Sequence, residues 1–437
     1  MEEYKKLEKL TEKYFEDLYK MFPTTATVMG IHHYDRSLDH FGKKEIDSYL
    51  QRLNDYRNRL KKIKKKTLVS QQFIDYEMLR LNIHANLRNF GRMKYWQKNP
   101  VIYTEVVMTG LYVLLSRDFS APAVRARNLV GRLEDISRVF GEARANLIPR
   151  QTPPQFVDSA IKSLKGSDSI FSFLIPELSK KLEDIKLQQK LLAAGRRAFL
   201  ELEGFKSFLE SFRVSALGSM QLGEKYYLDF VRNDYYLMDN LEELEKKGLQ
   251  VLRQTKRELS DLARKINPKK TWQEILTDDG KNKIIVSDQD LLGVYKEEIA
   301  RATAFIKEKD LLSLPESLKI KVIETPEFRR NVVPYISTIS PAPFDDDQTG
   351  YVVVTPTNET WRHFGYEIIV AHEAVPGHLA QRIIHNTSRQ ISSLRRKLCG
   401  IGMFVERKQP RQNLFDEGWA VYVEQMMTEA GYLRDDR

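Results

Sequence analysis

The residues best suited to chemistry in this 437-residue chain are two histidines and two glutamates near its C-terminus. The first three lie in the segment His372-Glu373-Ala374-Val375-Pro376-Gly377-His378, and Glu417 follows in the run Asp416-Glu417-Gly418-Trp419. A catalytic Zn²⁺ site typically combines three nitrogen or oxygen ligands with one open position for water. A glutamate beside the first ligand can take a proton from that water. The sequence therefore predicts a zinc site with His372, His378 and Glu417 as ligands and Glu373 as general base.

The spacing of the two histidines requires a break in the helix that carries them. In the ordinary H-E-x-x-H motif the histidines are four residues apart and share one helix face. Here they are six apart, which would place them roughly 120° apart on a straight helix. Pro376 cannot continue the helical hydrogen bonds, and Gly377 tolerates unusual backbone angles. We therefore expect two residues to loop out and bring His378 back beside His372.

Other residues near the motif could assist the site. Glu424 follows Glu417 by seven residues and shares its helix face, so it could accept the free ring N–H of a histidine ligand or remain solvated. Tyr422 is a candidate donor to the oxyanion. Four of the eight histidines lie between positions 363 and 385. Two of these, His363 and His385, are outside the motif, and a surface or packing role is favoured for them.

The elements that must position these residues fall into two regions. Residues 1–310 show apolar residues at helical spacing, for example Leu7, Leu10, Tyr14 and Leu18, with Pro23 as a stop signal. Three β-branched runs follow, at 318–322, 332–339 and 351–355, and helical periodicity returns from about 359. We expect a mainly α fold, with a helical scaffold over 1–310 and a small sheet plus metal-binding helices over 311–437, in one continuous domain. The run 351–355 is either an edge strand that pairs with extended substrate or part of a plain hairpin.

Composition limits the alternative functions. The chain is 42% hydrophobic and carries one cysteine, Cys399, which excludes an internal disulfide and a thiolate cluster. No window holds the ~18 apolar residues of a membrane span, and no secretory signal precedes the first helix, so the sequence predicts a cytoplasmic protein. The net charge of +10 raises a nucleic-acid-binding alternative. Because the lysines and arginines alternate with acidic residues, a solvated basic surface is favoured instead.

The motifs resemble a family of proteins proposed to be zinc peptidases, the domain-of-unknown-function family 885. Its hallmark H-E-A-x-P-G-H-H-x-Q corresponds to residues 372–381, with Leu379 in place of the second histidine of the doublet, and its E-G-W-A-x-Y corresponds to residues 417–422. The N-terminal residues Pro23, Ala26, Thr27, Gly30, Tyr34 and Asp35 fit a further family pattern, as do Thr152-Pro153-Pro154 and Thr325-Pro326-Glu327-Phe328.

The resemblance implies a large helical fold like that of the gluzincin carboxypeptidases and oligopeptidases. It also implies zinc as cofactor and short peptides as substrates. Members of the family continue past the E-G-W-A-x-Y motif into further helices. Two functions are therefore compatible with the sequence: a zinc peptidase, or a catalytically impaired binding scaffold. Whether a partner chain supplies the C-terminal segment would distinguish these two functions.

Overall fold

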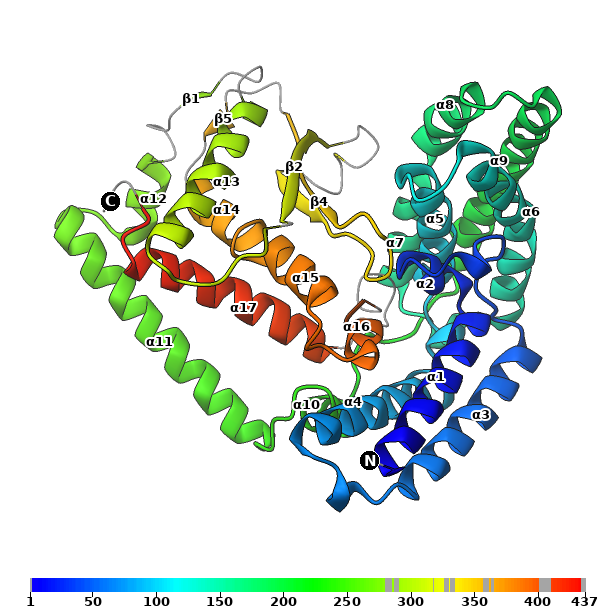
Figure 1. Cartoon of the computed structure of the whole chain (residues 1–437), viewed down its shortest axis with the longest axis horizontal. Coiled ribbons are helices and arrows are strands. Elements are labelled where there is room, and N and C mark those ends of the chain that lie inside the picture. The colour runs from blue at the N-terminus through cyan, green and yellow to red at the C-terminus, as the bar shows by residue number, and fades with distance from the viewer. Residues whose placement is uncertain are drawn as a thin grey trace.

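The protein is mainly α-helical, with a small three-stranded mixed sheet, as the sequence predicts (Figure 1). The computed structural model describes residues 2–279, 285–286, 291–316, 318–325, 330, 335–356, 361–362, 365–400 and 410–433. In this part of the chain, no helix is both long enough and apolar enough to cross a membrane.

The N-terminal half is a bundle of helices around one hydrophobic core. These helices are α1 (Glu2–Met21), α2 (Pro23–Val28), α3 (Lys43–Lys61), α4 (Ser70–Asn86), α5 (Val101–Ser116), α6 (Pro122–Asn146), α7 (Pro154–Lys165), α8 (Ile175–Lys180) and α9 (Ile185–Arg213). The stripe predicted for the first helix is buried, since Leu7, Leu10, Tyr14 and Leu18 are each at most 3% exposed. Helix α1 ends at Met21, just before Pro23, because proline cannot donate the next helical hydrogen bond.

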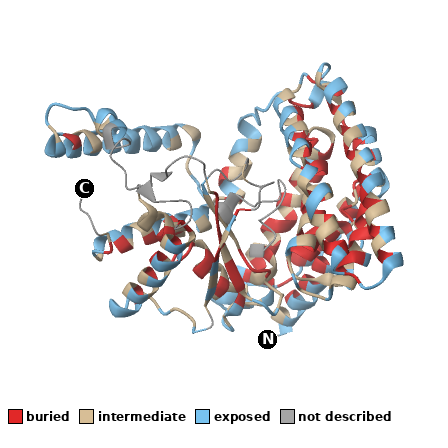
Figure 2. Ribbon diagram, turned by 90° about the horizontal axis from the view of Figure 1, so that it is seen from above, coloured by how far each residue is buried: buried red, intermediate tan, exposed pale blue. Residues whose placement is uncertain are grey.

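The helices of the C-terminal half include the two that carry the histidine motif. They are α10 (Glu224–Asn233), α11 (Leu241–Ile266), α12 (Trp272–Asp279), α13 (Leu291–Glu308), α14 (Tyr366–Glu373), α15 (His378–Thr387), α16 (Ser393–Gly400) and α17 (Pro410–Glu429). Figure 2 shows buried residues gathered in two separate regions, one in each half.

The sheet has the strand order β2-β4-β3. Strand β4 (Thr349–Val354) runs parallel to β2 (Lys319–Glu324) and antiparallel to β3 (Ile336–Ile339). The short strands β1 (Ile285–Val286) and β5 (Trp361–Arg362) form a separate antiparallel pair. The prediction that 351–355 forms an edge strand is therefore wrong. Strand β4 is paired on both sides and its three valines are buried, and β3 is the edge strand beside the motif.

The hydrophobic core consists of two clusters. The first joins residues between Leu7 and Ala216 and also takes in Leu394 and Leu398 of α16. The second extends from Leu291 to Tyr432 and packs α13, the sheet, α14, α15 and α17 together. The predicted boundary near residue 310 stays a prediction, although α13, which precedes that boundary, packs with the second cluster.

Candidate metal centre

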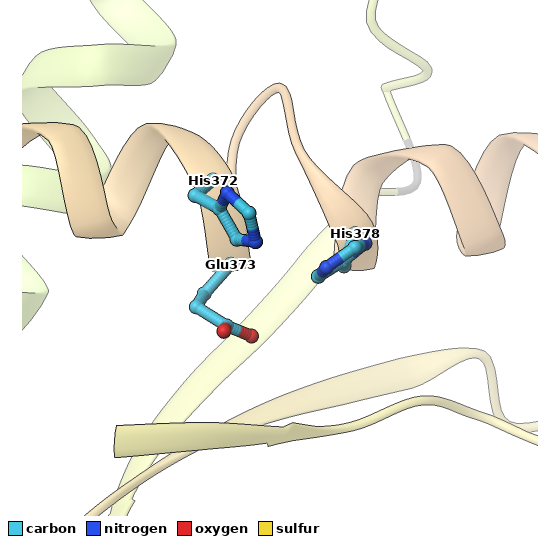
Figure 3. Close-up of side chains that lie close together, drawn as sticks. All are labelled: His372, Glu373 and His378. Carbon is cyan, nitrogen blue, oxygen red and sulfur yellow. The ribbon is translucent and has the colours of Figure 1, made fainter. Parts of the chain in front are cut away.

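The helix that carries the motif is interrupted between the two histidines. Helix α14 ends at Glu373 and α15 begins at His378, and a loop of four residues joins them (Figure 3). The loop has its own hydrogen bonds, because the backbone N–H of Val375 donates to the Val370 carbonyl at 3.1 Å and that of Ala380 to the Ala374 carbonyl at 3.0 Å. The break expected from Pro376 and Gly377 is confirmed.

Lack of space for a side chain explains glycine at 377. The φ of Gly377 is −71°, an ordinary value for any residue. Space is what excludes a side chain, because a Cβ at this position would lie 1.7 Å from the carbonyl oxygen of His372 and 2.4 Å from that of Ala371. Gly377 therefore lets the chain turn back tightly over the end of α14.

The loop brings the three predicted ligand side chains together. The Oε2 atom of Glu417 lies 3.6 Å from Nε2 of His372 and 3.6 Å from Nε2 of His378. The imidazole rings of His372 and His378 are nearly perpendicular, with centroids 4.8 Å apart. Ligand atoms about 2.0–2.1 Å from a tetrahedral zinc ion lie about 3.3–3.4 Å from one another. The donor set and its spacing fit a zinc ion after small side-chain adjustments.

Glu424 contacts Nδ1 of His372, the ring nitrogen that does not face Glu417. Its Oε1 atom lies 2.5 Å from Nδ1 of His372, so of the two alternatives that the sequence left open for Glu424, the contact with a histidine is present. A carboxylate that accepts the Nδ1–H proton fixes the ring orientation and leaves the Nε2 lone pair free for a metal.

Glu373 projects to the same place as the histidines (Figure 3). Ligand atoms of His372, Glu373 and His378 all lie within 4.8 Å of one another. Burial raises the pKa of the Glu373 carboxyl above its ordinary value, partly offset by His372 and by a hydrogen bond from the Thr338 hydroxyl. Thr338 lies on β3, and no motif in the sequence marks it as part of the site.

Two contacts fix α17 against the helices that bear the histidines. The Trp419 indole donates a 2.9 Å hydrogen bond to the carbonyl oxygen of Pro376 in the loop. Arg382 of α15 forms an ion pair with Asp416, the residue before Glu417. Sequence spacing did not predict the ion pair, because thirty-four residues separate its members.

The remaining predicted residues lie farther from the ligands. The Tyr422 side chain is 57% exposed, and its ring centroid lies 5.9 Å from that of Trp419. Tyr422 projects roughly 140° around α17 from Glu417. Its role as oxyanion donor stays a prediction. His385 is half-buried on α15, and burial lowers its pKa to about 4, which suits a packing role. His363 lies outside the described residues.

Leu379 occupies the position where the resembling family has a second histidine. Its side chain is fully buried in the second cluster, and it lies beside Gly350 of β4, where an added Cβ would be only 3.0 Å from a Leu379 methyl group. The preceding residue, His378, is the one that faces Glu417. The leucine therefore leaves the juxtaposition of His372, His378 and Glu417 intact.

A separate cavity of about 750 Å³ lies between the two halves of the molecule. It is lined by residues of both halves, among them His32, Phe119, Asp345 and Tyr351. None of the predicted site residues lines it, so the cavity is distinct from the ligand cluster.

Comparison with known proteins places nearly the whole chain in one family. The model of the family described as "Bacterial protein of unknown function (DUF885)" matches residues 23–437. A solved structure from Shewanella oneidensis, described as a "putative lipoprotein of unknown function", is 23% identical with a TM-score of 0.75, over 98% of this chain and 78% of that one. A "putative lipoprotein" from Colwellia psychrerythraea is 16% identical with a TM-score of 0.79, over 99% and 79%. No curated protein matches the chain. At these identities the two neighbours show a shared fold.

Proposed function

The chain belongs to the DUF885 family of bacterial proteins of unknown function, and we propose that it is a zinc-dependent peptidase of the gluzincin type. One observation carries the proposal: a single carboxylate oxygen of Glu417 lies 3.6 Å from the Nε2 atoms of both His372 and His378. Two imidazoles and one carboxylate are a ligand set typical of catalytic zinc in peptidases. The mainly helical fold with a small sheet beside the motif supports the same assignment.

His372, His378 and Glu417 would hold the ion, and Glu424 would orient His372. Zinc bound there would supply a Lewis acid that polarises the scissile carbonyl and lowers the pKa of water. The protein supplies the base. Glu373 accepts a proton from the attacking water and then returns it to the nitrogen of the leaving amine. The Thr338 hydroxyl, which donates to the Glu373 carboxyl, limits the orientations available to that carboxyl.

The substrate would bind beside β3. This edge strand pairs with β4 on one side only, and it carries Thr338, which contacts the general base. An extended peptide can add to such an edge through main-chain hydrogen bonds. Short, flexible peptides can adopt that extended conformation, so we propose them as the substrates.

A specific observation favours a second candidate function, a binding scaffold with impaired catalysis. The Glu417 side chain is 63% exposed, whereas active sites typically close against bulk solvent during the reaction. As to location, both neighbours are described as putative lipoproteins. A cell-envelope location is therefore the alternative to the predicted cytoplasmic one, and cell fractionation distinguishes them.

The first test is zinc content by mass spectrometry after incubation with zinc at neutral pH. We expect about one zinc per chain in the wild type and in Glu429→Ala, a matched control at an exposed position of α17, and much less in Glu417→Ala. Absence of zinc from the wild type would overturn the proposal.

The second test separates the peptidase from the scaffold. Glu373→Gln should keep its zinc and lose hydrolysis of a mixed peptide library, because it removes the base and leaves the ligands in place. A wild type that binds zinc but cleaves no peptide would favour the scaffold.

A further inference from the structure

The three-stranded sheet separates the candidate metal centre from the cavity between the two halves. On one face of the sheet, Val352 and Val354 pack in the second cluster with α14 and α15. On the other face, Lys321, Ile339 and Tyr351 line the cavity. These three are cross-strand neighbours, because Tyr351 pairs with both Lys321 and Ile339. In Figure 1 the sheet accordingly lies between α14 and the helices of the N-terminal bundle.

The free edge of β3 borders both places. Thr338 contacts the carboxyl of Glu373, and the next residue, Ile339, lines the cavity. Successive side chains of a strand point to opposite faces of its sheet. A peptide that adds to this edge follows the same alternation. It therefore presents one residue to the metal centre and the next residue to the cavity.

The cavity contains a cation whose hydrogen-bonding capacity is largely unused. Arg117 directly follows α5, lines the cavity and is partly buried. Its Nη1 donates to the carbonyl oxygen of Val28 at 2.9 Å, and within the described residues its guanidinium makes no other hydrogen bond and no ion pair. Burial lowers the pKa of Arg117, partly offset by the charge of Asp345. Because a partly buried charge without a counterion is unfavourable, this guanidinium is suited to bind an anionic group.

The other charged residues that line the cavity are either paired or exposed. Asp345 and Asp118 each lie next to a cation, at 2.9 and 2.6 Å. Three further charged residues are exposed to solvent: Lys321, Asp346 and Asp347. Arg117 is therefore the partly buried charge of the cavity that a ligand can neutralise.

We propose that this cavity is a second subsite for peptides, in which Arg117 binds a carboxylate of a peptide that lies on the edge of β3. This step rests on the proposed function, which places the peptide on that edge. The cavity volume of about 750 Å³ is large enough for a peptide residue, and the rings of Phe119 and Tyr351 supply apolar walls. The carboxylate is either the C-terminus of the peptide or an aspartate or glutamate side chain. Either group can accept two parallel N–H···O hydrogen bonds from a guanidinium.

The test measures binding of three pools of hexapeptides that carry an N-terminal dansyl group, a label without charge. The first pool has neutral side chains and a free C-terminus, the second has the same side chains and an amidated C-terminus, and the third is amidated and contains one glutamate. Each is titrated against zinc-treated Glu373→Gln, which should leave the peptides uncleaved. We expect the first or the third pool to bind at least tenfold more tightly than the second, as a charge-assisted hydrogen bond typically contributes. The pool that binds tightly identifies the source of the carboxylate.

Substitutions in the same Glu373→Gln background test the role of Arg117. Arg117→Gln should reduce the preference for a carboxylate to less than twofold and change the affinity for the second pool less than twofold. Arg127→Gln is the matched control, at an exposed arginine of α6 that does not line the cavity, and it should keep the preference. Because Arg117→Gln also removes the hydrogen bond to Val28, Ser116→Trp provides a second variant. Ser116 is an exposed residue that lines the cavity, so a tryptophan there should fill part of the cavity and weaken carboxylate binding at least threefold.

Three outcomes would overturn the subsite. They are equal affinity for all three pools, an equal loss of affinity for all pools in Arg117→Gln, and no binding of any pool at about 100 μM protein, where weak specific binding is still detectable. Zinc content and peptide cleavage by the wild type are measured in parallel. Zinc binding and cleavage without a preference for a carboxylate would refute the subsite and leave the peptidase proposal standing. Arg117-dependent binding of a carboxylate without zinc would support the subsite and refute the peptidase.

Discussion

Replacing Glu424 by glutamine should weaken zinc binding without changing any ligand. Oε1 of Glu424 lies within hydrogen-bond distance of Nδ1 of His372, and a carboxylate acceptor makes such a hydrogen bond charge-assisted. The carboxylate can only accept, so it keeps the proton on Nδ1 and the lone pair on Nε2. A glutamine amide can donate as well as accept, and it carries no charge. Loss of such a partner typically lowers metal affinity 10–100-fold, or about 1.4–2.7 kcal/mol.

The assay is competition for zinc against a chromogenic chelator at pH 7. Glu429→Gln is the control, since Glu429 is an exposed glutamate near the end of the same helix, and we expect it to bind zinc within twofold of the wild type. Circular dichroism checks that both variants keep their helices. If Glu424→Gln binds zinc within threefold of the wild type, the contact does not orient His372 and the reasoning is refuted.

Two further perturbations test the local geometry. Gly377→Ala places a methyl group against the His372 carbonyl oxygen, so it should destabilise the fold by about 1–3 kcal/mol and cost at least tenfold in zinc affinity; an unchanged affinity would contradict the tight turn. Burial lowers the pKa of His32, but hydrogen bonds to Asp345 and Asp35 outweigh it and raise that pKa to about 9. Protonated His32 therefore stabilises the fold fully below pH ~6.5, and this contribution disappears as pH rises through about 9. The stability lost in His32→Gln, measured by urea unfolding, should be larger at pH 6 than at pH 10, and a pH-independent loss would count against the ion pairs.

The ligand cluster could be predicted from the sequence because its chemistry is written into residue types and short spacings. The heptapeptide 372–378 contains two histidines, a glutamate, a proline and a glycine. These residue types indicated two candidate metal ligands, a general base and a break in the helix between the histidines. The seven-residue interval between Glu417 and Glu424 placed both on one helix face, and the structure puts both against the histidines. Local helix geometry was sufficient for each of these steps.

Contacts between distant segments could not be predicted in the same way. Strand order is one example, since the run 351–355 has the same composition whether it lies at the edge of the sheet or at its centre. The contact between Thr338 and Glu373 depends on which strand lies at that edge. The Arg382–Asp416 pair depends on how α17 packs against α15. Each requires tertiary packing, which residue spacing alone does not encode.

The three candidate ligands lie in the second half of the protein, but the chain that connects two of them contacts the first half. Helix α15 carries His378, and α16 follows it after a short connection. Leu394 and Leu398 of α16 belong to the first hydrophobic cluster, and Arg395 forms a 2.7 Å ion pair with the buried Asp75 of α4. Helix α16 is therefore fixed to the N-terminal bundle, whereas α14 and α17 pack in the second cluster. Helix α15, which carries His378, packs in that same second cluster through Leu379. The chain between His378 and Glu417 therefore contacts the first cluster through α16, while both residues lie on helices of the second.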